Sequence, residues 1–314
     1  MELMWLLIVG LFFGAWFVLD GFTVGVGLTM RMVTGPGTPR RAALTAVGPF
    51  LLANEVWLVA TAGLMAASYP ALESGVMPGL YPVITALLVS WVVRDAGFWF
   101  RSRRESRSWQ RFWEGALTAG SLGLALTAGI TLGNLLGGLP SAPEGAGVLD
   151  PLALACGVLV TGVFALHGAV FLSLRLPAEQ APAAAALAAR LSWPVAALGA
   201  VVVALTFVLG DLARPWPALA VALAGLAAVV LAGRFLAGRR YGRAFACTAL
   251  AALLPVLAVG FGQAPELRDG AATQTSLEQL ATLALPVIPL LLLSQVWMWW
   301  IFRHRVGRDS VAFF

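Results

Sequence analysis

Residues 4–30 read MWLLIVGLFFGAWFVLDGFTVGVGLTM, an apolar run that carries one ionisable side chain, Asp20. A helix needs about 20 mainly apolar residues to cross the hydrocarbon core of a bilayer, so this run predicts a transmembrane helix. Eight similar runs follow, at residues 43–67, 79–101, 112–137, 151–174, 191–211, 216–237, 242–262 and 279–302. Strands of a membrane barrel are short and alternate in hydrophobicity, whereas these runs are long and continuous. The sequence therefore predicts an all-α, polytopic membrane protein with nine transmembrane helices.

Composition and charge agree with a membrane protein. Of the 314 residues, 60% are hydrophobic and 11% are charged, whereas a soluble domain is about 25% charged. The 20 basic residues are all arginine, and 17 of them follow odd-numbered runs: Arg31, Arg40, Arg41, Arg101, Arg103, Arg104, Arg107, Arg111, Arg175, Arg190, Arg234, Arg239, Arg240, Arg243, Arg303, Arg305 and Arg308. Because positively charged loops stay in the cytoplasm, we expect the N-terminus outside and the C-terminus in the cytoplasm. The net charge of +5 then reflects topology, and no nucleic-acid partner is expected.

The chain divides by composition into three parts. Residues 1–140 form a predicted four-helix bundle with polar motifs, residues 141–262 a second bundle rich in Ala, Leu and Val, and residues 263–314 a ninth helix with a cytoplasmic tail. The Pro/Gly/Ala-rich segment 138–150 is the expected joint between the bundles. Residues 177–190 are expected to be a cytoplasmic connector or a short surface helix. Residues 1–10 lack a basic start and run into a full span, so no cleavable signal peptide is expected.

Polar side chains interrupt these apolar runs. An ionisable group near the bilayer centre costs about 2.5–3.5 kcal/mol, so it usually faces a partner, a cavity or a pathway. At a rise of 1.5 Å per residue, the acids, the arginine and the histidine fall at similar depth in four different helices. The candidate proton route or buried polar cluster consists of Asp20, Asn54, Glu55, Arg94, Asp95 and His167.

Two interpretations of this cluster stay open. In the first, Arg94 neutralises Asp20, Glu55 or Asp95 in a packed bundle, because buried charges need partners, and no chemistry follows. In the second, the groups form a hydrated track for protons or a site that grips a partner subunit. His167 is read as a hydrogen-bonded core residue rather than a ligand.

Other residues are predicted to serve helix packing or partner contact: Gly21, Gly25, Gly27, Trp57, Asn134 and Trp297. Gly21 and Gly25 are four residues apart, the spacing that lets transmembrane helices approach closely. A transmembrane haem normally needs histidine or methionine axial ligands, and His167 is the single histidine within a predicted span. No zinc spacing, nucleotide-binding loop or nucleophile motif is present. We therefore expect no metal and no cofactor on this chain, and a role within a complex.

The motifs resemble subunit II of cytochrome bd-type terminal oxidases, as a divergent member. The matching pieces are VLDGFTVGVG (18–27), ANEVWL (53–58), Arg94 with FWFR (98–101), TLGNLLGGLP (131–140), LHGA (166–169) and QVW (295–297) with Phe302 and Arg303. They are ordered and span the chain.

The resemblance implies a haem-free subunit II, itself non-catalytic, in a heterodimer with a homologous subunit I that carries haem b and haem d. Such a complex lies in the bacterial plasma membrane, oxidises quinol, reduces dioxygen to water and takes protons from the cytoplasm. Subunit II of some members holds a structural quinone or lipid, and some complexes contain small accessory subunits. Membrane lipids are further expected partners.

This chain departs from the family pattern at three acidic positions, which are Thr23, Leu52 and Trp99 here. Either protons reach the oxygen site wholly through subunit I, or Glu55 and Asp95 form a re-routed path. The first interpretation is favoured because Leu52 and Trp99 would interrupt a file of water.

A different class of protein is the alternative: a standalone membrane transporter, or an anchor subunit of an unrelated complex. Transporters often carry inverted repeats and spans broken near the midplane. Pro255, Pro286 and Pro289 are candidate breaks. The polar groups, however, lie mainly in one half of the chain, whereas a transporter site would lie between two repeats.

Overall fold

The computed structural model describes residues 1–34, 38–138 and 148–307, and every regular element within these ranges is a helix. Most of the predicted joint 138–150 lies outside the described residues. In chain order the elements are α1 (Glu2–Val33), α2 (Thr38–Val47), the 3-10 turn η1 (Gly48–Phe50), α3 (Leu51–Ser68), α4 (Pro70–Gly79), α5 (Tyr81–Arg101), α6 (Arg107–Leu136), α7 (Pro151–Arg175), α8 (Ala181–Leu209), α9 (Pro215–Ala237), α10 (Tyr241–Gly262), α11 (Ala264–Asp269), α12 (Gln274–Ala284) and α13 (Val287–Ile301).

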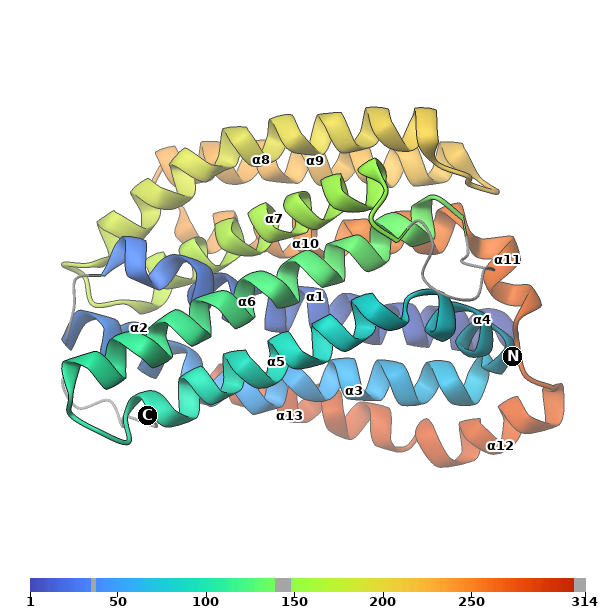
Figure 1. The fold of residues 1–314 in the computed structure, drawn as a ribbon, viewed down its shortest axis with the longest axis horizontal. Coiled ribbons are helices and arrows are strands. Elements are labelled where there is room, and N and C mark those ends of the chain that lie inside the picture. Colours follow the sequence, from blue (N-terminus) through green and yellow to red (C-terminus); the bar gives the residue numbers. More distant parts are fainter. Residues whose placement is uncertain (35–37, 139–147, 308–314) are drawn as a thin grey trace.

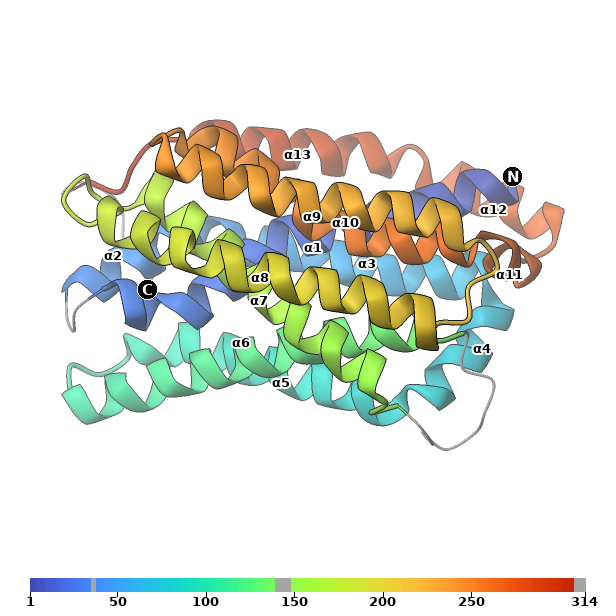
Figure 2. The ribbon, with the colours of Figure 1, turned by 90° about the horizontal axis from the view of Figure 1, so that it is seen from above.

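The long helices lie side by side, with α8 and α9 along one edge of the molecule and α3, α12 and α13 along the other (Figure 1). Helix α1 lies in the middle both in this view and in the perpendicular view of Figure 2. The N-terminus, α4, α11 and α12 gather at one end, and α2 and the turn between α5 and α6 lie at the opposite end. Residues from the first and last thirds of the sequence therefore meet around α1.

The number of spans depends on one bent pair of helices. Eight described helical segments are long and apolar enough to cross a membrane, and the number rises to nine if α12 and α13 together count as one span. These two helices are bent by 41° relative to each other. The predicted span 279–302 is therefore divided between two helices, and the candidate break at Pro286 falls between them. Pro286 has no backbone N–H to continue the hydrogen-bond ladder, which is a common cause of a kink.

Other boundaries also differ from the prediction. Residues 181–190 are neither a connector nor a separate surface helix, because α8 begins at Ala181 and continues to Leu209. Alanine has the highest helix propensity, so this alanine-rich segment extends the span by ten residues. The predicted helix 43–67 is interrupted by η1 around Pro49, and the short helices α4 and α11 were not predicted. Pro255 lies inside α10, which continues past it.

The core is centred on the contact between α1 and α7. A Cβ atom on Gly25 would overlap the backbone at Phe164, and one on Gly168 would overlap the backbone at Gly25. Both helices thus need glycine there, because only the missing side chain lets the backbones approach so closely. The largest buried apolar cluster joins residues of α1, α3 and α6 with residues of α7 to α10. Packing is therefore continuous across residue 140, and the division into two bundles stays a prediction.

Candidate functional site

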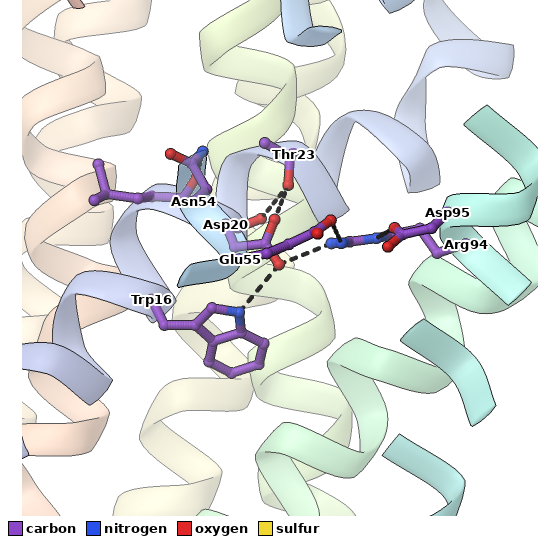
Figure 3. Close-up of polar contacts among 8 residues, drawn as sticks. Trp16, Asp20, Thr23, Asn54, Glu55, Arg94 and Asp95 are labelled. Carbon is purple, nitrogen blue, oxygen red and sulfur yellow. Dashed lines mark hydrogen bonds and ion pairs between the residues drawn. The ribbon is translucent and has the colours of Figure 1, made fainter. Parts of the chain in front are cut away.

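The predicted acids and arginine converge in the space between α1, α3 and α5 (Figure 3). Arg94 on α5 donates from Nη1 to Asp20 Oδ2 on α1 at 2.7 Å and from Nη2 to Glu55 Oε1 on α3 at 2.5 Å. Its Nε donates to Oδ1 of the neighbouring Asp95 at 2.9 Å. One guanidinium therefore connects three carboxyl groups on three helices.

The geometry suits arginine and no other cation. A guanidinium presents five N–H donors in a planar fork, whereas a lysine ammonium is a compact point charge. Arg94 is wholly buried, with 0% of its side chain exposed. Because desolvation of two buried charges is repaid only when geometry and further hydrogen bonds are good, the arrangement depends on all three nitrogen positions being used. The cluster fixes the relative positions of α1, α3 and α5.

Exposure increases across the cluster. The Asp20 side chain is 1% exposed, that of Glu55 11% and that of Asp95 22%. The cluster thus extends from the protein interior to its outer surface, and Asp95 is its outer end. With all groups ionised, three carboxylates face one guanidinium.

Two residues that the sequence did not single out as a site complete the inner end. Trp16 Nε1 donates to Asp20 Oδ2 at 3.0 Å, and the Thr23 hydroxyl contacts Oδ1 of the same carboxylate. Trp16 precedes Asp20 by four residues and Thr23 follows it by three, spacings that place side chains on one helical face. That spacing was the sequence feature that could have assigned Trp16 and Thr23 to the site. Thr23, noted as a lost acid, instead supplies a hydroxyl to the acid that remains.

Asn54 belongs to a second hydrogen-bonded group, the polar arm, which it forms with Trp57 and Gln295. It points away from Arg94 (Figure 3), and its Nδ2 donates to Leu19 O at 2.6 Å. Gln295 on α13 donates to Asn54 Oδ1 at 3.0 Å and accepts from Trp57 Nε1 at 3.4 Å. This arm links α1, α3 and α13. Gln295 was quoted within a family motif but not as a site residue.

His167 does not join the ion cluster. Its Nδ1 lies 2.8 Å from Thr248 Oγ1 on α10, and its Nε2 lies 3.0 Å from Val18 O on α1. The ring stacks on Phe245 with centroids 4.7 Å apart. Both nitrogens are therefore engaged, and the residue joins α7 to α1 and α10.

The remaining predicted residues are scattered. A Cβ on Gly21 would lie 2.8 Å from the Phe164 ring, and one on Gly27 would overlap the Ser121 hydroxyl. Asn134 donates to Ile130 O at 2.9 Å and to Val148 O at 3.0 Å, at the end of α6. Trp297 is 63% exposed, so its ring is mostly outside the packing of this chain.

Sequence reasoning missed a second ion cluster near the turn between α5 and α6. Glu114 on α6 accepts from Arg40 at 2.5 Å and from Arg101 at 2.9 Å. Its side chain is 3% exposed. An acid placed next to an arginine-rich loop was the available signal. The pairs tie α2 and α5 to α6 at that end of the molecule.

An apolar cavity of about 360 Å³ lies among α6, α7, α8, α9 and α10. Its lining includes Leu132, Val160, Val202, Leu226 and Ala251, with Thr206 and Asp211 among its few polar residues. Its apolar lining suits a hydrocarbon chain rather than a polar substrate.

The fold and the site define a class: a polytopic α-helical membrane protein whose spans are joined by a buried ion cluster that reaches its surface. The particular family follows from comparison with known proteins. A family model described as "Cytochrome bd terminal oxidase subunit II" matches residues 1–302, so the chain belongs to this family and the resemblance is confirmed.

Individual relatives agree. The chain is 30% identical over 189 residues to cytochrome bd-I ubiquinol oxidase subunit 2 of Escherichia coli (strain K12), an alignment that covers 57% of this chain and 50% of that protein. The match thus spans about half the length of that relative. Cytochrome bd ubiquinol oxidase subunit 2 of Bacillus subtilis (strain 168) is 26% identical over 328 residues, covering 98% and 97% of the two chains. A chain of the bd oxidase from Geobacillus thermodenitrificans shares the fold, with a TM-score of 0.74, 17% identity and coverage of 94% and 98%.

Proposed function

We propose that this chain is the haem-free subunit II of a bd-type terminal oxidase that oxidises quinol and reduces dioxygen to water. The observation that carries the proposal is the ion cluster, in a chain that belongs to the subunit II family. It extends from the core toward the surface, with Asp95 at its outer end. Ionisable groups at a face that meets lipid are costly. A partner subunit packed over that face would shield them from lipid.

The histidines of this chain support the location of the haems on the partner subunit. The chain has two histidines. His167 has both ring nitrogens engaged, with Thr248 and with the backbone of Val18. His304 follows the end of α13 rather than lying in a span. Neither histidine is therefore placed to bind a haem within a span, and no redox step is assigned to the described residues.

The cluster acts as a structural element in this proposal. Arg94 lies among all three carboxyl groups, and a fixed positive charge in a narrow path opposes the passage of protons. We therefore assign proton delivery to subunit I and keep this chain as a non-catalytic subunit. The route through Glu55 and Asp95 is the alternative, and a large fall in oxygen consumption by a Glu55→Gln variant would support it.

The cavity supports a bound lipid or structural quinone. Its apolar lining matches an acyl or isoprenoid chain, which would gain about 0.8 kcal/mol for each buried methylene group. The bias of arginines to one set of loops supports an outside N-terminus, a cytoplasmic C-terminus and a place in the bacterial plasma membrane. Extraction of the purified protein and mass spectrometry of the extract would identify the occupant of the cavity.

Purification from native membranes tests the function. A tag on this chain should bring down a second membrane subunit with a reduced haem spectrum, and the pair should consume oxygen when quinol is added. A colourless chain that is monodisperse alone, or that catalyses transport in vesicles, would contradict the proposal in favour of the transporter class.

A further inference from the structure

Helix α5 exposes a stripe with coiled-coil spacing. Tyr81, Thr85, Leu88 and Val92 are all exposed and are followed at the same spacing by Asp95 and Trp99. The steps alternate between four and three residues, which is the period of a helix that packs along another helix. Asp95 is the one acidic residue in the stripe.

Helix α3 exposes a matching stripe. Leu52, Val56, Val59, Gly63 and Ala66 are exposed and follow the same alternation of four and three residues. Glu55 lies at its margin, three residues after Leu52. Because Arg94 contacts both Glu55 and Asp95, the two stripes approach each other at the ion cluster. They flank one charged spot on a surface that otherwise carries no charged residue of either stripe.

The charge of this spot is unbalanced. Arg94 is the one cation in contact with the three carboxyl groups among residues 1–34, 38–138 and 148–307. Even if one carboxyl group is protonated, two negative charges face one positive charge. An ionised carboxylate in contact with lipid is costly, and a buried charge requires a partner. A cation from outside this chain would balance the excess negative charge.

We propose that a transmembrane helix of subunit I packs between the stripes of α3 and α5 and places an arginine or lysine against Asp95. This inference rests on the proposed function and names the chemistry of the partner. The apolar stripes alone would suit lipid equally well. The carboxylates favour a protein partner over lipid, because a lipid tail offers no cation at this depth, whereas a partner helix can offer one. The cation also fixes the register of the two subunits, since Asp95 is the only acidic position along the stripes.

Replacements of Asp95 in the tagged complex distinguish a basic partner helix from lipid at this face. Asp95→Asn keeps the shape but removes the charge, Asp95→Leu suits lipid, and Asp95→Glu keeps the charge. Glu73→Gln, on α4 outside the cluster, is the matched control. The readout is the haem absorbance retained per tagged chain during prolonged washing in detergent. Loss of one partner of a buried charged pair mainly speeds dissociation, so we expect roughly thirtyfold or greater acceleration for Asn and Leu. The Glu variant and the control should behave like the wild type.

Retention by Asp95→Asn equal to the wild type would show that a neutral group suffices and would overturn the cationic partner. Equal retention by Asp95→Leu would show that the face meets lipid. A wild-type chain without any haem partner would instead overturn the proposed function, which keeps the two failures distinct.

A second variant leaves the cluster intact. Val92, 68% exposed and one turn before Asp95, is replaced by the photocrosslinker p-benzoylphenylalanine in the wild-type complex. Irradiation should join it to a peptide of subunit I that contains an arginine or lysine within one helical turn. A crosslinked peptide without a basic residue, or crosslinks to lipid alone, would overturn the inference even if the Asp95 variants fail to accumulate.

Discussion

Replacement of Arg94 by leucine removes the cation that holds three helices together. Its guanidinium is buried and contacts Asp20 at 2.7 Å, Glu55 at 2.5 Å and Asp95 at 2.9 Å. Removal of one partner from a buried ion pair costs about 3–5 kcal/mol. Protonation of one orphaned carboxyl group of ordinary acidity at neutral pH costs about 4 kcal/mol, at 1.36 kcal/mol for each of about three pH units. Both estimates predict a large loss of stability.

The second estimate also predicts a dependence on pH. In the Arg94→Leu variant, orphaned carboxyl groups take up protons in the folded state more readily than in the unfolded state. Folding then binds protons, so the stability of the variant rises as pH falls. The deficit relative to the wild type should therefore shrink between about pH 8 and pH 5.

Thermal unfolding of the purified complex measures this deficit. The matched control is Arg111→Leu, which removes an exposed arginine near the start of α6 and should leave the midpoint unchanged. Adding Asp20→Asn to Arg94→Leu removes one of the orphaned charges and should restore part of the loss. An unchanged midpoint for Arg94→Leu, or a deficit that is the same at every pH, would refute the reasoning.

Three further predictions concern other parts of the molecule. Glu55→Gln should leave oxygen consumption per haem of intact complex close to the wild-type value, whereas a fall of roughly tenfold or more would indicate proton transfer through this residue. Gly25→Val should destabilise the subunit by about 1–3 kcal/mol or more, because a side chain there overlaps the α7 backbone. The control is Gly10→Val, where a Cβ meets nothing within 4 Å, and equal thermal midpoints for the two variants would contradict the prediction. Glu114→Gln should cost about 3–5 kcal/mol by leaving two arginines without their acid, and a melt identical to that of the wild type would show that the pairs are not stabilising.

Most of the fold could be predicted from the hydrophobicity of the sequence. Continuous apolar runs located the long spans, because a bilayer-crossing helix needs a fixed length of apolar sequence whatever it packs against. The bend at Pro286 and the early start of α8 at Ala181 were not resolved by the same criterion. Local backbone chemistry decides both, through a missing N–H in the first case and helix propensity in the second. Hydropathy alone does not register either effect.

The site was predictable in part. The depth estimate placed Asp20, Glu55 and Arg94 at one level, since helical rise converts sequence position into height. Depth does not fix the direction in which a side chain points. His167 lies on the face of α7 that meets Thr248 and Val18 and so stays outside the cluster. The contributions of Trp16, Thr23 and Gln295 depend on rotation and tertiary packing of the helices, which a single sequence does not specify.

The most direct test of the central claim is the composition and colour of the complex that this chain forms in its native membrane. Purification through a tag on this chain should yield a second polytopic subunit in about equal amount, with reduced-minus-oxidised absorbance from haem in that subunit. A monodisperse, colourless protein without a second subunit would contradict the proposal that the buried ion cluster serves a haem-bearing partner.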